Sequence, residues 1–352
     1  MNGMLQLLGH ILRISSRRDR TEINEQLLEA MQELFNPLDV RLLRCYANEE
    51  RVLVHDVAGL SAEGSYYRNA YLPDQRHCSP INDDPLLTEA WRTLTLQSEP
   101  FGTDWQRLVF PVAQDKKLHY LLDCVLARDF DSDQSVLLMG LTEFFAKHIA
   151  LLDYGETDTL TELANRKTFD KHLFEVLGQA ALDALAMDKD NLLHRRRGSP
   201  LGVCHWLAVC DIDKFKSIND THGHLIGDEV LVMMAQLMRR SFRLADQLFR
   251  FGGEEFVIVL QPTNPADALG VFERFRSQVA AHNFSRVGHV TISIGFTQLQ
   301  AADSPSQVID RADEALYFAK SNGRNQVAFY EDLVADGRLV PKTVDHGDIE
   351  LF

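Results

Sequence analysis

The chain has 352 residues, of which 45% are hydrophobic and 25% are charged, and its formal net charge is -15. This length favours two globular domains over one. The acidic balance argues against a surface that binds duplex DNA, because such surfaces concentrate lysine and arginine against the phosphates. An acidic protein can still bind a nucleotide where a metal ion supplies the positive charge.

Cysteine usage and apolar runs indicate the compartment. The five cysteines are scattered and include no CxxC pair, so neither a disulfide framework nor a zinc site is predicted. The most apolar window, residues 136–152, is interrupted by Glu143, Lys147 and His148, which predicts no membrane span. The apolar amino terminus has its charges after the apolar part, the reverse of a signal peptide. We therefore expect a soluble, cytoplasmic protein.

Residues 1–155 show an α+β pattern. Apolar residues recur at helical spacing from Thr21 to Phe35. Strand-like runs follow at residues 40–46, 51–57, 107–113 and 118–127. Residues 61–105 are poorly patterned and are expected to form a long irregular lid.

A helix from about Asp133 to Asp153 closes this first domain and places one apolar stripe on Leu141, Phe145, Ile149 and Leu152. The stripe can pack on its own domain or form a dimeric connector that passes a signal onward, and the two roles are compatible. A helix, an antiparallel sheet and a lid resemble a GAF sensor domain. A PAS-type domain is the alternative, and the ligand cannot be read from the sequence.

Residues 156–330 alternate between helical and strand patterns, which predicts a central sheet flanked by helices. The expected elements are helix 166–187, strand 201–211, helix 227–241, hairpin 248–260, helix 265–281, strand 290–295 and helix 306–321. Residues 187–200 are interpreted as a solvated loop and residues 331–352 as a mobile tail.

Acidic side chains gather at two strand ends of this second domain. Strand 201–211 runs into Asp211-Ile212-Asp213, at the sheet edge where α/β proteins commonly bind ligands. Gly252-Gly253 predicts a tight turn with positive φ, which places Glu254 and Glu255 at the rim of an antiparallel hairpin. Neighbouring carboxylates repel unless a cation binds, so Mg²⁺ or Mn²⁺ is expected here.

Four segments carry a family resemblance in order and spacing: DTLTELANRKTF, DIDKFKSINDTHGHLIGD, RFGGEEF and ADEALYFAKSNGRNQV. Together they resemble the GGDEF family of bacterial diguanylate cyclases, in a GGEEF variant, over residues 156–330. The resemblance implies a palm-like sheet flanked by helices, similar to that of nucleotide cyclases. It also implies that two GTP molecules are joined into cyclic di-GMP, with release of pyrophosphate.

The resemblance assigns roles residue by residue. As metal ligands it implies Asp211, the carbonyl of Ile212, Glu254 and, as a further ligand or catalytic group, Glu255. As GTP-binding positions it implies Asn219 and Asp228 for guanine, Lys216, Lys320 and Arg324 for the triphosphate, and Gly252 and Gly253 at the hairpin. Glu254, Glu255 and Lys320 are the implied catalytic residues. Guanine offers N–H donors that a carboxylate accepts and adenine does not.

The segment RLAD places Arg243 and Asp246 shortly before the glycine pair. In the family this spacing marks an inhibitory product site, to which Arg274 adds a second arginine. Arginine forks suit guanine and phosphate, whereas the alternative is a surface ion pair of little energetic consequence.

One such domain holds one GTP, so a homodimer is expected. The alternative to a cyclase is a non-catalytic cyclic di-GMP receptor that acts through the RxxD site. Purely structural dimerisation through the first domain explains none of the acidic residues.

Overall fold

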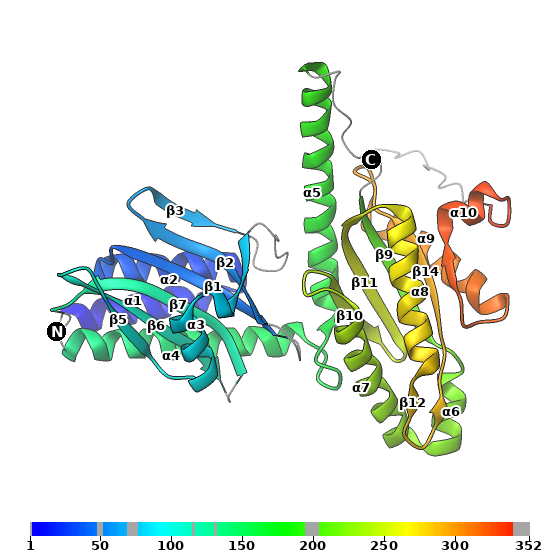
Figure 1. The fold of residues 1–352 in the computed structure, drawn as a ribbon, viewed down its shortest axis with the longest axis horizontal. Helices are drawn as coiled ribbons and strands as arrows, with labels where there is room; N and C mark the ends of the chain where they lie inside the picture. The colour runs from blue at the N-terminus through cyan, green and yellow to red at the C-terminus, as the bar shows by residue number, and fades with distance from the viewer. Residues whose placement is uncertain are drawn as a thin grey trace, which may run out of the picture. The chain divides into compact units, whose positions relative to one another are not determined.

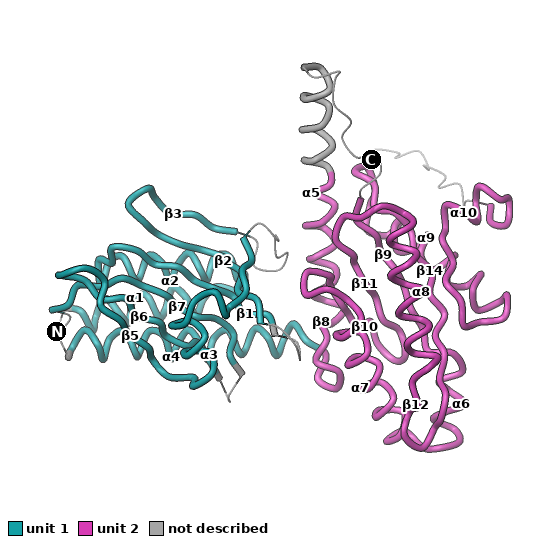
Figure 2. Tube along the Cα trace, viewed as in Figure 1, with its two compact units in different colours: residues 1–157 teal, residues 158–352 magenta. Residues whose placement is uncertain are grey.

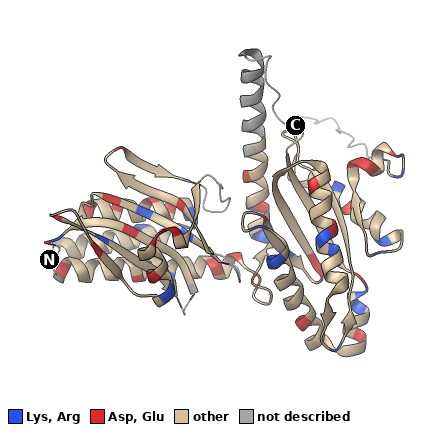
Figure 3. Ribbon diagram, viewed as in Figure 1, with Lys and Arg blue, Asp and Glu red and all other residues tan. Residues whose placement is uncertain are grey.

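The computed structural model describes residues 2–47, 52–68, 77–114, 117–129, 132–193 and 204–340. The chain divides into two compact units, residues 1–157 and 158–352 (Figure 2). Acidic and basic residues are interspersed in both units (Figure 3). The expected mixed α+β fold class is confirmed.

Unit 1 is built on a seven-stranded sheet in which every pairing between neighbours is antiparallel (Figure 1). The strand order is β3-β2-β1-β7-β6-β5, and β4 pairs with β2. The strands are β1 Asp39–Ala47, β2 Val52–Ser61, β3 Gly64–Tyr67, β4 Cys78–Pro80, β5 Gln97–Phe101, β6 Trp105–Gln114 and β7 Lys117–Ala127. The four strand-like runs predicted from the sequence are confirmed as β1, β2, β6 and β7.

One face of this sheet is covered by α1 (Asn2–Ser16), α2 (Arg20–Phe35) and α4 (Ser132–Glu156), whose apolar side chains share one core with it. Asp19 caps α2 by accepting hydrogen bonds from the backbone of Thr21 and Glu22. Leu141, Phe145 and Ile149 of the α4 stripe are fully buried and Leu152 is partly buried, so its packing on its own domain is confirmed. By length and composition α4 is the one helix among the described residues that could cross a membrane, yet its buried stripe lies in the core of unit 1.

The other face carries a short 3₁₀ helix, η2 (Ile81–Asp83), and α3 (Pro85–Thr93). The expectation of an irregular lid over residues 61–105 is therefore wrong for the described part of that stretch, which holds three strands and a helix. The pattern is hard to detect because two of these strands, β3 and β5, are largely exposed and lack alternating apolar residues.

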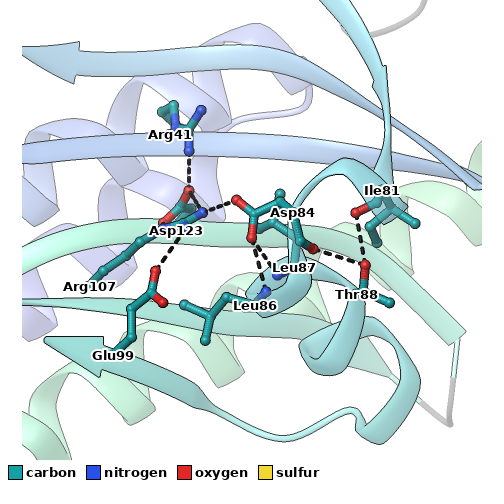
Figure 4. A network of polar contacts seen from close by, with 9 residues as sticks. All are labelled: Arg41, Ile81, Asp84, Leu86, Leu87, Thr88, Glu99, Arg107 and Asp123. Atoms are coloured by element: carbon teal, nitrogen blue, oxygen red, sulfur yellow. Dashed lines mark hydrogen bonds and ion pairs between the residues drawn. The ribbon is translucent and has the colours of Figure 1, made fainter. Parts of the chain in front are cut away.

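A charged network ties α3 to the sheet (Figure 4). Arg107 of β6 binds the buried Asp123 of β7 through two hydrogen bonds of 2.9 Å. It also contacts Asp84 at 2.6 Å and Glu99 at 3.1 Å, and Arg41 of β1 binds the same Asp123 at 2.5 Å. Asp84 is the N-cap of α3, so one arginine links three strands to a helix terminus. Burial raises the pKa of Asp84, but hydrogen bonds from Arg107 outweigh it and leave that pKa below its usual value.

A second buried network surrounds the last turn of α4. Arg20 of α2 is only 1% exposed and pairs with Asp153 and, at 2.8 Å, with Glu156. His119 of β7 also contacts Asp153, and Arg20 donates to the hydroxyl of Tyr120 at 3.4 Å. Burial alone would raise the pKa of Asp153, but the hydrogen bond from His119 and the charge of Arg20 hold that pKa well below its usual range.

Replacing the buried Arg20 with methionine is expected to lower the stability of unit 1 by about 3 kcal/mol, because it leaves two half-buried carboxylates, those of Asp153 and Glu156, without their cation. Hydrogen–deuterium exchange of core amides in unit 1 measures this. Arg17→Met is the matched control, since the Arg17 side chain makes an exposed 3.4 Å pair with Glu22. Such a pair contributes about 1 kcal/mol or less to the free energy of unfolding.

The same pair predicts a pH dependence. The folded-state pKa of Asp153 lies below the unfolded one, so its contribution is present at neutral pH and is lost as the pH falls below about 4. The stability gap between wild type and Arg20→Met should therefore narrow in acid. A gap that is constant from pH 7 to pH 3 would contradict this account.

Unit 2 has a six-stranded mixed sheet of order β15-β14-β9-β11-β10-β8. The strands are β8 Ala164–Asn165, β9 Cys204–Ile212, β10 Gln247–Gly252, β11 Glu255–Thr263, β14 Ile292–Gln298 and β15 Val327–Phe329, with a separate hairpin of β12 Asn283–Phe284 and β13 Gly288–His289. The helices are α5 Arg166–Leu193, α6 Phe215–His222, α7 His224–Ser241, α8 Pro265–Ala281, α9 Pro305–Ser321 and α10 Tyr330–Ala335.

The two faces of this sheet have different partners. Alternate residues of β9, among them Trp206, Ala208 and Cys210, share a core with α7 and α8. The opposite face packs on α9, where Gly295 of β14 has no room for a side chain because an added Cβ would lie 2.1 Å from the backbone nitrogen of Leu316. This close approach brings α9 against the central strands, so that residues of α9 can reach the end of β9.

Three boundaries differ from those expected. Helix α5 extends to Leu193, so the first part of the predicted 187–200 loop is helical, and residues 194–200 lie outside the described residues. The short helix α6 was not predicted. Residues 330–335 form α10, with Leu333 buried against the α9 side of the fold, so this part of the predicted tail is folded. Residues 341–352 lie outside the described residues.

Candidate active site

The predicted acidic residues meet at one edge of the sheet of unit 2. In the β9–β11 register Glu255 lies directly opposite Asp211, and in the β9–β14 register Ser293 lies opposite the same residue. Residues directly opposite each other in an antiparallel pair share a face. Asp211 is buried, and its Oδ2 lies 2.7 Å from Nζ of Lys320 on α9.

The hairpin that carries the glutamates differs in detail from the predicted one. Gly252 pairs with Glu255, so the two turn residues are Gly253 and Glu254, whereas Gly252-Gly253 was expected. Both glycines have positive φ, 143° and 54°, as the sequence indicates. A bulge before Gly252 shifts the turn by one residue. Glu254 therefore lies in the turn itself, and its carbonyl accepts a 3.4 Å hydrogen bond from the backbone of Ile212.

Arg250 braces this turn from β10. Its guanidinium donates to the carbonyl of Gly253 at 2.9 and 3.3 Å and to Asp158 at 2.8 Å. Asp158 in turn accepts from the backbone and hydroxyl of Thr161. The first residue of unit 2 is thus joined to the hairpin tip through one side chain.

Removing either partner should loosen the tip. In Arg250→Ala and in Asp158→Ala we expect amide exchange at residues 252–255 to accelerate about tenfold, because a hydrogen bond to a charged group contributes about 1.5–3 kcal/mol. The double variant should add little to either change. Arg338→Ala is the control, because it removes an exposed pair with Asp336 and a contact with the Phe318 ring and none of the contacts that Arg250 makes. Equal protection in all variants would show that the brace has no effect on the turn.

The charges at this edge perturb one another. Burial raises the pKa of Asp211 although Lys320 opposes it. Burial and the negative charge of Asp211 raise the pKa of Glu254. Burial, followed by the charge of Glu255, raises the pKa of Asp313 on α9 to about 6. Burial is the largest cause of each shift, and the neighbouring carboxylates add to it while Lys320 opposes it.

Sequence reasoning missed Asp313, which lies seven residues before Lys320 on α9. Seven residues are about two helical turns, so the two side chains share a face of the helix. That spacing could have indicated Asp313 as a site residue, but only if α9 had already been known to face the carboxylates.

These residues fit Mg²⁺ or Mn²⁺ only partly on their own. Among the described residues no three His, Cys, Asp or Glu side chains converge as a ready-made metal cage. Mg²⁺, however, is commonly held by one or two carboxylates together with substrate phosphates and water. Asp211, Glu254 and the Ile212 carbonyl lie at one rim and could supply that smaller donor set.

Asp213 does not belong to this donor set. Its carboxylate accepts hydrogen bonds from the hydroxyls of Ser293 and Thr291, both at 2.7 Å, and from the backbone of Asn325 at 3.0 Å. Asp211 and Asp213 therefore have different roles. Asp211 faces Lys320 at the acidic edge, whereas Asp213 joins β14 to the loop after α9. The extended geometry that suggested a shared site ends at Ile212, the last residue of β9.

The predicted base-recognition residues lie on successive helices. Asn219 is on α6 and Asp228 is on the first turns of α7, with Gly223 (φ 84°) between the helices. A Cβ on Gly227 would come within 1.9 Å of the Asn219 side-chain oxygen. Gly227 is thus a site residue that sequence reasoning missed, because it leaves room for the Asn219 amide beside α7.

The predicted phosphate-binding cations are placed differently from one another. Lys320 is at the carboxylate edge, whereas Lys216 is exposed on α6. Arg324 follows α9 with a left-handed φ of 63° and borders a cleft beside α6.

The three residues of the predicted inhibitory site are brought together. Arg243, Asp246 and Arg274 line one cleft of about 380 Å³ between β11 and α8. Asp246 accepts from the backbone of Arg243 at 2.9 Å and of Gln261 at 3.1 Å, while the Arg274 guanidinium donates to the Ser241 carbonyl at 3.3 Å. The Asp246 carboxylate therefore shapes the loop through backbone hydrogen bonds, and the alternative reading of a simple surface ion pair does not account for these contacts.

Residues 156–326 match the family model described as diguanylate cyclase, GGDEF domain. The chain contains a GGDEF domain. The matched range includes the acidic edge, both predicted base-recognition residues and the RxxD cleft.

Known relatives of this GGDEF domain include two curated proteins. The chain is 39% identical over 183 residues to the response regulator PleD of Caulobacter vibrioides, covering 50% of this chain and 36% of PleD. It is 38% identical over 174 residues to diguanylate cyclase DgcP of Pseudomonas aeruginosa, covering 49% of this chain and 23% of DgcP. The chain thus spans well under two thirds of either relative.

Among solved structures, the GGDEF domain of DgcB from Caulobacter crescentus in complex with c-di-GMP is 34% identical, with a TM-score of 0.42. That match covers 50% of this chain and 96% of the DgcB domain.

Proposed function

We propose that this protein is a diguanylate cyclase that condenses two GTP molecules into cyclic di-GMP and two pyrophosphates. The observation that carries the proposal is the register of β9 and β11, which sets Glu255 opposite Asp211 beside Glu254 and Lys320. The family match and the relatives named as diguanylate cyclases support it.

In the proposed mechanism, Asn219 and Asp228 orient the guanine, and Lys216, Lys320 and Arg324 bind the triphosphate. Asp211, the Ile212 carbonyl and Glu254 hold Mg²⁺ or Mn²⁺, with Glu255 as a further acidic ligand or proton acceptor. Such an ion lowers the pKa of the attacking hydroxyl and neutralises charge on the α-phosphate.

The reaction needs two domains that face each other. The 3'-oxygen of one GTP forms a bond to the α-phosphorus of the other, while the bond to the β-phosphate oxygen breaks and pyrophosphate leaves. The proton of the hydroxyl passes to a carboxylate at the rim, a role that we assign to Glu255, which lies opposite Asp211. Since each domain holds one GTP, the working form is a homodimer.

Unit 1 is proposed as the sensor. Its antiparallel sheet with helices on both faces supports a GAF-like domain, with a PAS-type domain as the alternative. Its last helix, α4, ends two residues before Asp158, the residue that Arg250 joins to the hairpin tip. We place the protein in the cytoplasm, with product binding at Arg243, Asp246 and Arg274 as the second control.

Chromatography of nucleotide-free protein incubated with GTP and Mg²⁺ tests the function directly. Cyclic di-GMP should appear with GTP and not with ATP. A second candidate, a non-catalytic cyclic di-GMP receptor, is favoured by the RxxD cleft alone. If the protein binds cyclic di-GMP but yields none, including after deletion of residues 1–157, the receptor is the correct function and the cyclase is not.

A further inference from the structure

A polar cleft of about 480 Å³ lies on the side of α6 next to the β12–β13 hairpin and the loop Gly323–Asn325. We call it the α6 cleft. Neither of the proposed guanine-binding residues lines it, and neither does any proposed metal ligand. It borders the active site only through Arg324.

The α6 cleft carries positive charge in a chain whose net charge is -15. Four basic side chains line it: Lys214, His222, His289 and Arg324. Among the described residues, none of these four side chains makes an ion pair or a hydrogen bond to the protein. Unpaired basic groups that converge on one hollow favour an anion.

The one carboxylate in the lining is already occupied. Asp213 accepts three hydrogen bonds from Ser293, Thr291 and Asn325. It therefore has little capacity left to bind a cation, and it fixes the two walls of the cleft relative to each other. The hydroxyls of Ser217 and Thr221 on α6 add neutral donors of the kind that phosphate oxygens accept.

The backbone of the cleft is held in an unusual conformation. Lys214, Arg324 and Asn325 have φ values of 59°, 63° and 48°, in the left-handed region that residues with a side chain seldom adopt. Such conformations cost about 1–3 kcal/mol each and persist where the surrounding structure imposes them, which is common at ligand sites. Two of the four basic residues are thus positioned at an energetic cost.

We propose that the α6 cleft binds the pyrophosphate released by the cyclase reaction. Arg324 would hold the outer phosphates of GTP, and Lys214, His222 and His289 would draw the leaving pyrophosphate away from the reacting atoms. The chemistry recognised is that of a diphosphate anion, and its assignment to the reaction product rests on the proposed cyclase function. The cleft volume lies within the range of small-ligand sites and accommodates this anion with water.

Calorimetric titration of the full-length protein with sodium pyrophosphate in EDTA is the test. Without Mg²⁺ the carboxylate edge repels the anion, whereas the α6 cleft needs no metal, so wild type should bind. Lys214→Met/His289→Gln should weaken binding at least about tenfold, since each charged hydrogen bond contributes about 1.5–3 kcal/mol. Arg286→Gln, which removes a positive charge from the same hairpin outside the cleft lining, should change the affinity less than twofold.

A non-hydrolysable GTP analogue with Mg²⁺ shows whether the variants keep their fold and active site, and its affinity should stay within about twofold. Two results would overturn the proposal: no pyrophosphate binding by wild type in EDTA, or binding that Lys320→Met abolishes and Lys214→Met/His289→Gln leaves intact. The titration measures binding alone and needs no turnover of GTP. Its result therefore distinguishes failure of the pyrophosphate site from failure of the cyclase proposal. If the protein binds pyrophosphate in the α6 cleft but makes no cyclic di-GMP, the diphosphate site is supported and its assignment to the cyclase product is wrong. The diphosphate would then come from another reaction.

Discussion

Glu254→Gln is expected to reduce the rate of cyclic di-GMP formation at least about 100-fold. The substitution keeps the size of the side chain and removes the charge that we propose as a ligand of the metal ion. Changes to groups that merely support metal ligands already cost about 10–100-fold. Burial, followed by the negative charge of Asp211, raises the pKa of Glu254, so a bound cation would favour its ionised form. Initial rates at several Mg²⁺ concentrations, with product separated by chromatography, measure the loss.

The matched control is Asp170→Asn, which removes one exposed carboxylate from α5 and should change the rate less than about twofold. Glu255→Gln separates the two roles proposed for the neighbouring residue. If Glu255 accepts the proton, the variant loses turnover but keeps Mg²⁺-dependent GTP binding; if it is mainly a ligand, both fall together. Full activity in Glu254→Gln would exclude this hairpin as the metal site.

The second large effect is expected at the RxxD cleft. Arg243→Ala/Arg274→Ala should weaken cyclic di-GMP binding at least about 100-fold, because two charged hydrogen-bond donors contribute about 3 kcal/mol or more together. Both arginines line the same cleft while the half-buried Asp246 holds the loop between them. Calorimetry with cyclic di-GMP measures the affinity, and progress curves with GTP measure the release from inhibition.

The initial rate of the double variant should equal that of wild type, whereas its turnover should no longer slow as product accumulates. Arg276→Ala is the control, because Arg276 lies on the same helix but pairs with Glu273 and does not line the cleft. Purified double variant that still carries bound cyclic di-GMP would mean that the product binds elsewhere.

Much of unit 2 could be predicted because its signals are local. Period-two and helical patterns place β9, α8 and α9 to within a few residues, and a glycine pair predicts a tight hairpin. The adjacency of β10 and β11 follows from the hairpin alone. The adjacency of β11 and β9 does not, since the two strands are distant in sequence, and it is the register of this pair that sets Glu255 opposite Asp211.

In unit 1 the prediction was weakest where burial is weakest. The strands β1 and β7 contain many buried apolar residues, whereas β3 and β5 are exposed and have no apolar face to reveal them. Helix α3 was not predicted. Its N-cap, Asp84, is held by Arg107 of β6, and this contact cannot be seen in the local sequence. An ion pair between residues far apart in the sequence produces no periodic pattern from which it could be predicted.

The sequence by itself determined the residue types at the active site, their order and the family of the second unit, because these depend on motifs read along the chain. Only the tertiary structure decided which of them act together. It assigned Asp213 to bracing rather than to metal binding, placed Asp313 near Glu255, and gathered Lys214, His222, His289 and Arg324 around one cleft. The physical reason is that electrostatic and hydrogen-bonding partners are chosen by distance in space, and the packing of α9 and α6 against the sheet sets those distances.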